Sequence, residues 1–274
     1  TPNSNGWIDT INYFIMFGFY KNKTQFLKKH AIYEDMYVGR PRPIKVVADF
    51  TDKEELKAKY NSFAIELSKD EALDLPPLVF ENIYFKPSRE YKVIEKDRVL
   101  EVDNELILYD SISKLQHALR YYANQKDKLK YIEMLAESTK ENIVIFYNYT
   151  DEKEELVKIM KKLKKRIYEV SGQRSEIPDK NDWNTLNNSV TIVQYRAGSA
   201  GIELQYANVV VFYSPTYSYQ DYEQALGRCY RNGQDKKVTA YRFMTKDSIE
   251  MAIYGALNKK KDFNEQLFRK ELGM

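Results

Sequence analysis

Cysteine and histidine, the residues from which disulfides and most metal centres are built, are nearly missing from this chain. Its 274 residues include one cysteine, Cys229, and two histidines, His30 and His117. A single cysteine excludes an intramolecular disulfide and fits a reducing compartment. Neither histidine is closely spaced with a second residue of a metal-binding type, so the sequence predicts no zinc centre and no other metal site.

Long apolar runs are missing as well. No segment approaches the ~20 apolar residues that span a bilayer, and no basic stretch followed by an apolar one opens the chain. The apolar stretch at residues 11–20 is short and predicts a buried helix. We therefore expect a soluble, cytoplasmic protein of a prokaryote or a phage, with no membrane partner.

The chain has no phosphate-binding loop of the form G-x-x-x-x-G-K-[ST], since no glycine is followed by lysine. The acidic stretch at residues 150–154 lies several positions past a predicted strand, so it indicates a helix cap and an acidic first turn, not a Mg²⁺ site. The chain by itself is therefore not expected to hydrolyse ATP. Its net charge is only +3, so any nucleic-acid site must be a local patch.

What the chain does have is a globular composition, with 43% hydrophobic and 30% charged residues, and two alternating patterns. Short apolar runs, typical of strands buried on both faces, alternate with segments of helical spacing. This alternation predicts an α/β fold, a parallel sheet flanked by helices. The expected strands are Leu78–Phe85, Asn142–Tyr147, Tyr168–Val170, Val190–Val193, Asn208–Tyr213 and Val238–Phe243.

The N-terminal part of the chain has helical spacing and predicts a mainly helical subdomain. One helix is expected to begin near Ser4 or Asn5, and a second to span Thr24–Tyr37. A third spans Thr51–Ser68 and opens with a capping box to Glu54. Further helices are expected at residues 88–95, 110–122, 127–138, 152–165 and 248–271.

A polar segment with helical spacing begins near Ser218 and is expected to end at Gly233. Gln224, Arg228 and Arg231 stand at i, i+4 and i+7 on it and would share one helical face. Two arginines this close repel each other unless an anion lies beside them, and their planar forks suit phosphate oxygens. The alternative is a solvated basic face paired with neighbouring glutamates.

Residues 191–234 resemble motifs V and VI of the superfamily-two helicases, most closely those of the SWI/SNF-type branch of DNA translocases. Motif VI of that branch reads Q-A-x-x-R-x-x-R-x-G-Q, and Gln224, Arg228, Arg231 and Gln234 match it in register. The resemblance implies the second RecA-like lobe of such a motor. The first residues resemble the end of motif III, so we expect the C-terminal half of a longer protein, inactive without the other half.

The resemblance implies that ATP and Mg²⁺ are bound mainly by an N-terminal lobe of the same parent chain, with ATP in the cleft between the lobes. Arg228 and Arg231 would reach the γ-phosphate, with Arg231 as the arginine finger and Gln224 orienting Arg228 or a bound water. Gly198 and Gly201 would let backbone N–H groups approach a phosphate.

The resemblance further implies that Glu203, where the family commonly has Asn or Asp, accepts from an ATP ribose hydroxyl or braces Arg231. The partner would be DNA, with duplex favoured. Gln194 and Tyr195 stand where the family usually has two small hydroxyl residues, so their reach to a phosphate is altered. The residues expected to contact the nucleic-acid backbone are Gln173, Arg174, Gln194, Tyr195, Arg196 and Ser199.

Other functions stay open at this point. A strand-separating lobe of a DNA or RNA helicase would unwind a forked duplex, whereas a degenerate lobe would act only as a binding scaffold. Intact Gln224, Arg228 and Arg231 argue against degeneracy and against a nucleotide-sugar transferase lobe. The expected segments are a helical part at 1–75, a returning strand with helices at 76–124, the RecA-like lobe at 125–247 and a helical extension at 248–274.

Overall fold

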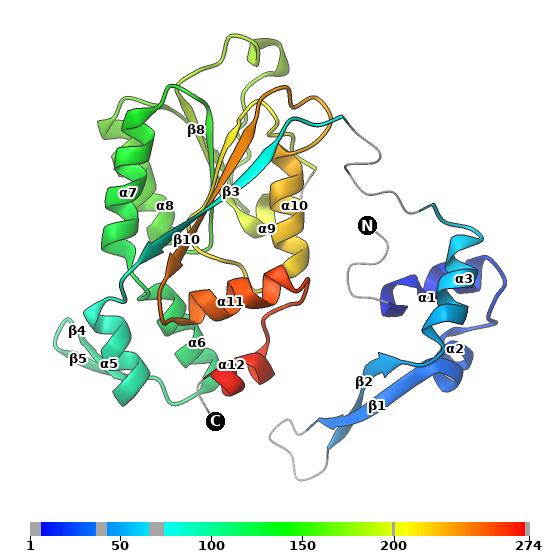
Figure 1. Ribbon diagram of the computed structural model, residues 1–274. Coiled ribbons are helices and arrows are strands. Elements are labelled where there is room, and N and C mark those ends of the chain that lie inside the picture. Colours follow the sequence, from blue (N-terminus) through cyan, green and yellow to red (C-terminus); the bar gives the residue numbers. More distant parts are fainter. Residues whose placement is uncertain (1–6, 37–42, 66–73, 199–200, 272–274) are drawn as a thin grey trace. The chain divides into compact units, whose positions relative to one another are not determined.

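The structure, a computed structural model, divides the chain into two compact units, Thr1–Leu73 and Asp74–Met274 (Figure 1). Among the residues that it describes, no helix is both long enough and apolar enough to cross a bilayer. The described residues are 7–36, 43–65, 74–198 and 201–271.

The N-terminal unit is built on aromatic packing. Phe14 is fully buried, and its ring contacts those of Phe19, Tyr20, Phe26 and Phe63. Ring pairs of this kind contribute about 0.5–1.5 kcal/mol each beyond the area that they bury. The unit therefore has a core of its own. Its described elements are α1 (Trp7–Met16), α2 (Lys23–His30), β1 (Ala31–Met36), β2 (Ile44–Phe50) and α3 (Lys53–Asn61).

The predicted helix at Thr24–Tyr37 is wrong in its second half. α2 ends at His30, and Ala31 adopts an extended backbone with φ −76° and ψ 131°. β1 then pairs antiparallel with β2, a strand that the sequence analysis did not predict. Tertiary pairing overrides the helical spacing here, as it often does for short segments. The expected helix start near Ser4 or Asn5 lies outside the described residues.

The predicted capping box at Thr51 is also wrong. α3 begins at Lys53, behind Asp52, whose backbone is left-handed with φ 53° and whose side chain caps no helix N–H. The Thr51 hydroxyl donates to the Asp52 carboxylate at 3.0 Å instead. That carboxylate also lies 3.1 Å from Nδ1 of the buried His30. The threonine is therefore used in a polar network between α2 and α3, and α3 ends at Asn61.

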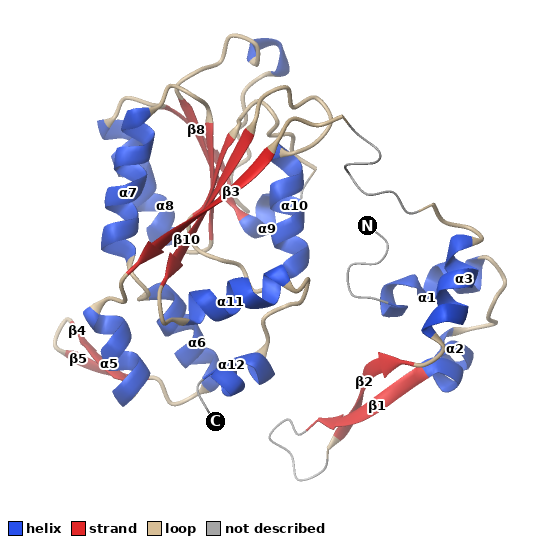
Figure 2. Cartoon of the chain, in the orientation of Figure 1, coloured by secondary structure: helices blue, strands red, loops and turns tan. Residues whose placement is uncertain are grey.

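The second unit is organised around a six-stranded parallel sheet, which confirms the predicted α/β fold (Figure 2). The central strand Ile143–Tyr147 is buried along its whole length. Strands covered on both faces need apolar residues at every position, which is why the sequence displays them as unbroken runs. In spatial order the strands are β3 (Leu78–Phe85), β10 (Val238–Thr245), β9 (Val209–Phe212), β6 (Ile143–Tyr147), β8 (Ser189–Gln194) and β7 (Arg166–Val170).

Helices cover both faces of the sheet, and alternate residues of each strand point to opposite faces. The face that carries Ile143 and Ile145 packs against α7 and α8, and the face that carries Val144 and Phe146 packs against α9, α10 and α11 (Figure 1). These helices are α7 (Gln125–Ser138), α8 (Thr150–Lys162), α9 (Tyr195–Gly198), α10 (Tyr219–Cys229) and α11 (Ile249–Asn258).

A buried ion pair joins the first turns of two of these helices. Lys128 of α7 and Glu250 of α11 pair with each other, and neither side chain is exposed. Glu250 also accepts from the Thr245 N–H at 2.8 Å. The pair thus ties α7 to α11 and to the end of β10. The remaining described elements are α5 (Arg89–Asp97), β4 (Val99–Val102), β5 (Glu105–Leu108), α6 (Ile112–Tyr121), η1 (Lys180–Asp182) and α12 (Glu265–Glu271).

Candidate functional site

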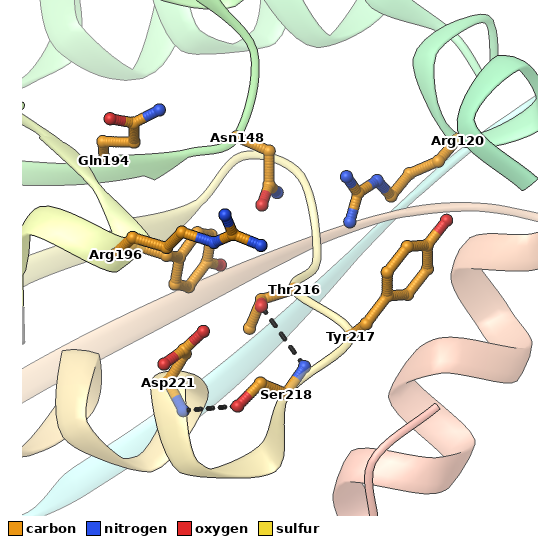
Figure 3. A pocket seen from close by; sticks show the side chains of 9 residues that line it. Arg120, Asn148, Gln194, Arg196, Thr216, Tyr217, Ser218 and Asp221 are labelled. Carbon is orange, nitrogen blue, oxygen red and sulfur yellow. Dashed lines mark hydrogen bonds between the residues drawn. The ribbon is translucent and has the colours of Figure 1, made fainter. Parts of the chain in front are cut away.

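Segments that follow neighbouring strands enclose a polar cavity at the carboxyl edge of the sheet. Parallel strands end at the same edge, so residues far apart in sequence meet there. We call this cavity, of about 240 Å³, the carboxyl-edge pocket (Figure 3). It is lined by Arg120, Asn148, Gln194, Tyr195, Arg196, Thr216, Tyr217, Ser218 and Asp221.

Three residues predicted to contact nucleic acid lie in this pocket. Gln194 is the last residue of β8, and Tyr195 and Arg196 open α9. Arg196 is exposed, and Figure 3 shows its side chain reaching into the pocket above Asp221. Burial raises the pKa of the Asp221 carboxyl, and the charge of Arg196 partly offsets that shift.

Tyr195 is a core residue as well as a lining residue. It is 3% exposed, and its ring packs against Phe146 and Phe212 with centroid distances of 5.5 and 6.3 Å. Its hydroxyl is buried and has no hydrogen-bond partner within the described part of the chain. An unsatisfied buried polar group costs about 1–3 kcal/mol. A phosphate would therefore have to enter the pocket to meet this hydroxyl.

Arg120 of α6 is a lining residue that the sequence analysis did not predict. Its Nε donates to the Tyr149 hydroxyl at 2.7 Å, and its Nη1 donates to the Pro215 carbonyl at 3.4 Å. Its guanidinium carbon lies 4.1 Å from the ring centroid of Tyr217 and 4.9 Å from that of Tyr149. Aromatic faces stabilise a cation without neutralising it. The positive charge of Arg120 is therefore retained at the pocket wall.

Glu152 fixes the loops around the pocket. Its carboxylate accepts from the N–H groups of Asn148 and Tyr149 at 3.0 and 3.1 Å, and from the Ser214 hydroxyl at 2.9 Å. The Asn148 amide donates to the carbonyls of Ser214 and Pro215, each at 3.1 Å. The acidic stretch after β6 is thus a helix cap and first turn, as predicted. It holds the β6 and β9 loops in one arrangement.

The opposite end of α10 carries the predicted catalytic residues, all of them partly exposed. Gln224 and Arg228 lie on the helix, but the helix ends at Cys229 and not at Gly233. Arg231 therefore lies beyond the helix, and the prediction of one helical face for all three residues is wrong for Arg231.

The side chain of Gln234 supplies the physical reason for the early helix end. Its amide donates to the carbonyls of Gln205, Ala207 and Cys229 at 3.0, 3.0 and 3.2 Å. The Leu204 N–H also donates to the Arg228 carbonyl at 3.1 Å. Carbonyls of the last turn are thus bonded outside the helix, and the glutamine of the motif VI match has a structural role.

Glu203 lies beside the arginines at this end. Lys180 of η1 pairs with its carboxylate. The hydrogen bond from Lys180 holds the pKa of Glu203 below its usual value, and the charge of Arg231 acts in the same direction. Glu203 therefore has Lys180 as its direct partner, while Arg231 contributes through its nearby charge. A direct brace between Glu203 and Arg231 stays a prediction.

Gln173 and Arg174 are not among the residues that line the carboxyl-edge pocket. Both are exposed in the turn after β7. Arg174 pairs with Glu169 at 3.4 Å and with Glu176 at 2.8 Å. A phosphate contact by Arg174 would therefore compete with two carboxylates.

The predicted glycine turn is described only in part. Gly198 ends α9, and Gly201 has φ 78°, a left-handed conformation that favours glycine. Space does not require a glycine at 201, because an added Cβ would meet nothing within 4 Å. Ser199 lies outside the described residues, so its predicted phosphate contact stays a prediction.

Several lining residues carried a signal that the sequence analysis did not use. Asn148 directly follows β6, and Thr216 and Tyr217 lie in the loop that follows β9. Ligands of parallel α/β sheets bind outside the carboxyl ends of the strands, so these positions were candidates by topology. Arg120 had no such signal, because tertiary packing brings it to residues as distant as Pro215.

Comparison with known proteins shows which domain part of this chain resembles. Residues 125–233 match the helicase conserved C-terminal domain. The ATP-dependent helicase fft3 of Schizosaccharomyces pombe is 27% identical over 208 residues, covering 72% of this chain and 22% of that protein. The chromatin-remodelling ATPase INO80 of Mycosarcoma maydis is 35% identical over 85 residues, covering 31% of this chain and 4% of that protein. The chain thus spans about a fifth or less of these relatives.

A solved structure supports the predicted RecA-like second lobe. The C-terminal part of the Fun30 ATPase domain superposes with a TM-score of 0.54 at 17% identity, covering 73% of this chain and 97% of that one. An identity this low establishes the fold alone. Together with the domain match, it confirms the α/β architecture that motifs V and VI implied.

The relatives also correct one prediction. A cytoplasmic protein of a prokaryote or phage was expected, but fft3 and INO80 are both proteins of eukaryotes. The name of INO80 refers to chromatin. These relatives contradict the prokaryotic or phage assignment.

Proposed function

Because residues 125–233 belong to the helicase conserved C-terminal domain family, we propose that this chain is the second motor lobe of a SWI/SNF-type, DNA-stimulated ATPase. The observation that carries the proposal is that α10 has arginines near both of its ends. Arg196 lies by its first turn, and Arg228 and Arg231 lie at its other end. One helix thus links a candidate DNA site to a candidate nucleotide site.

At the nucleotide end, Arg231 acts as the arginine finger on the γ-phosphate of ATP held by the other lobe. Its position past the last turn of α10 and its partial exposure suit a residue that reaches across a cleft. Arg228 supports the same phosphate, and Gln224 orients Arg228 or a bound water. Mg²⁺ enters with ATP and is held by the other lobe. An arginine in this role is worth about 10³–10⁵ in rate.

At the other end, phosphates of duplex DNA contact the carboxyl-edge pocket through Gln194, Tyr195 and Arg196. Contacts to phosphate position a protein on DNA but carry no sequence information. Closure of the two lobes around ATP, and reopening after hydrolysis, would then move this lobe along one strand.

The test is ATP hydrolysis by protein that contains both lobes, measured with and without duplex DNA. We expect DNA to stimulate turnover, and this chain alone to be inactive because it has no phosphate-binding loop. A second assay on a forked duplex separates translocation from strand separation, since a translocase leaves the fork paired. A rate of ATP hydrolysis that duplex DNA does not change would contradict the proposal.

A further inference from the structure

We infer that Arg120 is a second cationic ligand, beside Arg196, for the single backbone phosphate that the carboxyl-edge pocket is proposed to bind. Arg120 precedes the matched domain at residues 125–233. The inference rests on the proposed function for the source of the phosphate, which is nucleic acid, but the pocket itself is argued from its own side chains.

Two guanidiniums converge on this pocket. Figure 3 shows the side chains of Arg120 and Arg196 pointing toward one another from opposite walls. Within the described part of the chain, Arg120 is bonded to a hydroxyl and a carbonyl, and no carboxylate pairs with it. Asp221 faces Arg196 and offsets one positive charge at most. Among the lining residues two guanidiniums thus face one carboxylate, and an anion between the arginines would offset their mutual repulsion.

Arg120 is held in position before any ligand arrives. Its Nε and Nη1 are engaged by Tyr149 and Pro215, and the rings of Tyr149 and Tyr217 lie against its guanidinium. Arginine has five N–H donors in a planar fork, so donors remain for a ligand. A cation fixed in this way loses little conformational entropy on binding, which favours affinity.

Tyr195 provides an independent sign of a ligand. Tyr195 lines the same pocket, and its buried hydroxyl has no hydrogen-bond partner among the described residues. A phosphate oxygen can accept from this O–H. The first turn of α10 contributes less, because the Tyr219 N–H already donates to Asp262 at 2.7 Å and the Asp221 N–H to Ser218 at 3.1 Å.

The size of the cavity favours a backbone phosphate over a whole nucleotide. Small-molecule sites measure roughly 300–1,000 Å³, whereas this pocket measures about 240 Å³. One phosphate group fits such a space while the rest of the polymer continues outside. Free phosphate has the same chemistry, so the test must separate the two sources.

The test is the binding of a short fluorescein-labelled DNA duplex to the full 274-residue chain, followed by anisotropy at several salt concentrations. Arg120→Gln is expected to weaken binding about tenfold at low salt. It should also lower the slope of log K against log salt by about 1, the signature of one lost phosphate contact. Arg196→Gln removes an exposed residue from the same pocket and is expected to act in the same way.

Arg166→Gln is the matched control. Arg166 is the first residue of β7, is exposed and lies at the opposite edge of the sheet, so its loss should change neither affinity nor slope. Weaker binding with an unchanged salt slope in both pocket variants would overturn the inference. If circular dichroism shows that Arg120→Gln does not fold, Arg196→Gln decides in the same way.

A second experiment measures the melting temperature of the chain with and without inorganic pyrophosphate. Stabilisation that needs Arg120, in a chain that does not bind the duplex, would leave an anion site but overturn nucleic acid as its source, and the proposed function with it. Duplex binding that Arg196→Gln weakens but a folded Arg120→Gln leaves unchanged would overturn the inference and leave the proposed function standing.

Discussion

The two ends of α10 each lie near a pair of arginines, yet the pairs differ in how far the chain completes their surroundings. At the first turn, Arg120 and Arg196 face the carboxyl-edge pocket, whose loops are fixed by hydrogen bonds. At the other end, Arg228 in the last turn and Arg231 beyond it are partly exposed, and the charge of Arg231 acts on Glu203. The first site is thus formed by residues of this chain, whereas the proposed function has the second completed by another lobe.

The largest expected effect is a loss of ATP turnover that leaves duplex binding at the other end of α10 unchanged. Arg231→Ala should lower DNA-stimulated ATP turnover of the two-lobed protein about 10³–10⁵-fold, because the charge on the transferring phosphate loses its stabilisation. ATP binding and duplex affinity should stay unchanged. Arg269→Ala, at an exposed arginine paired with Glu265 at 2.8 Å, is the control. Unchanged turnover in Arg231→Ala would remove the finger assignment.

A change in the buried ion pair should lower the stability of the whole second unit, and so affect both ends of α10. Lys128→Met leaves Glu250 buried without its partner, so we expect the free energy of unfolding to fall by about 3–5 kcal/mol. Urea denaturation measures this loss. The double variant Lys128→Met with Glu250→Leu should recover much of it. A single variant that costs less than about 1 kcal/mol would mean that the pair behaves like a surface salt bridge.

A smaller effect is expected from a change that alters the carboxyl-edge pocket alone. Tyr149→Phe removes the acceptor for Arg120 Nε, so the guanidinium loses part of its fixed geometry. Duplex affinity should fall about fivefold, since one hydrogen bond contributes about 1 kcal/mol. ATP turnover at saturating DNA should not change. Tyr121→Phe is the matched control, because that hydroxyl bonds Asp151 and does not line the pocket. Equal effects of the two variants would contradict a positioning role for Tyr149.

The smallest expected effect is a pH dependence of duplex binding at the carboxyl-edge pocket. Burial raises the pKa of Asp221, so this carboxyl takes up a proton at a higher pH than usual, and its negative charge disappears from the pocket as the pH falls. Duplex affinity should therefore rise as the pH falls through that pKa. Asp221→Asn should tighten binding about two- to fivefold at neutral pH and abolish this trend.

Other titratable groups near that pocket need their own controls. Asp262 lies near Asp221, and Arg196 stays charged throughout. Burial and the charge of Arg120 lower the pKa of His117, so this imidazole gains its proton at a lower pH than usual. Asp262→Asn and His117→Gln should preserve the pH trend. A trend that disappears in either of them would assign it to another group.

The sequence predicted the sheet well because its central strands are buried on both faces. Ile143–Tyr147 and Val209–Phe212 are apolar at every position, and no periodicity is needed to find them. β1 and β2 were not predicted because they are largely exposed. Ile32 and Tyr33 are 42% and 46% exposed, so neither strand shows a clean alternation of buried and exposed positions.

Within the candidate site too, some residues could be predicted from the sequence and others could not. Gln194 and Arg196 could be predicted because they lie next to a strand end within one motif. Arg120 could not, since its neighbour Pro215 is 95 residues away and the contact exists only in the folded chain. The end of α10 was missed because the side chain of Gln234 donates to the Cys229 carbonyl at the end of the helix, a contact that helix propensity does not predict.

The pairing of β3 with β10 determines the order in which this domain can fold. Asn82 of β3 and Arg242 of β10 bond each other across 160 residues of sequence. A ribosome adding about 5–20 residues per second releases β3 roughly 10–30 s before its partner strand exists. During that interval an apolar edge strand is unpaired and open to association with other chains. Expression of the matched segment 125–233 alone would omit both strands, so a fragment chosen for expression should retain β3 and β10 together.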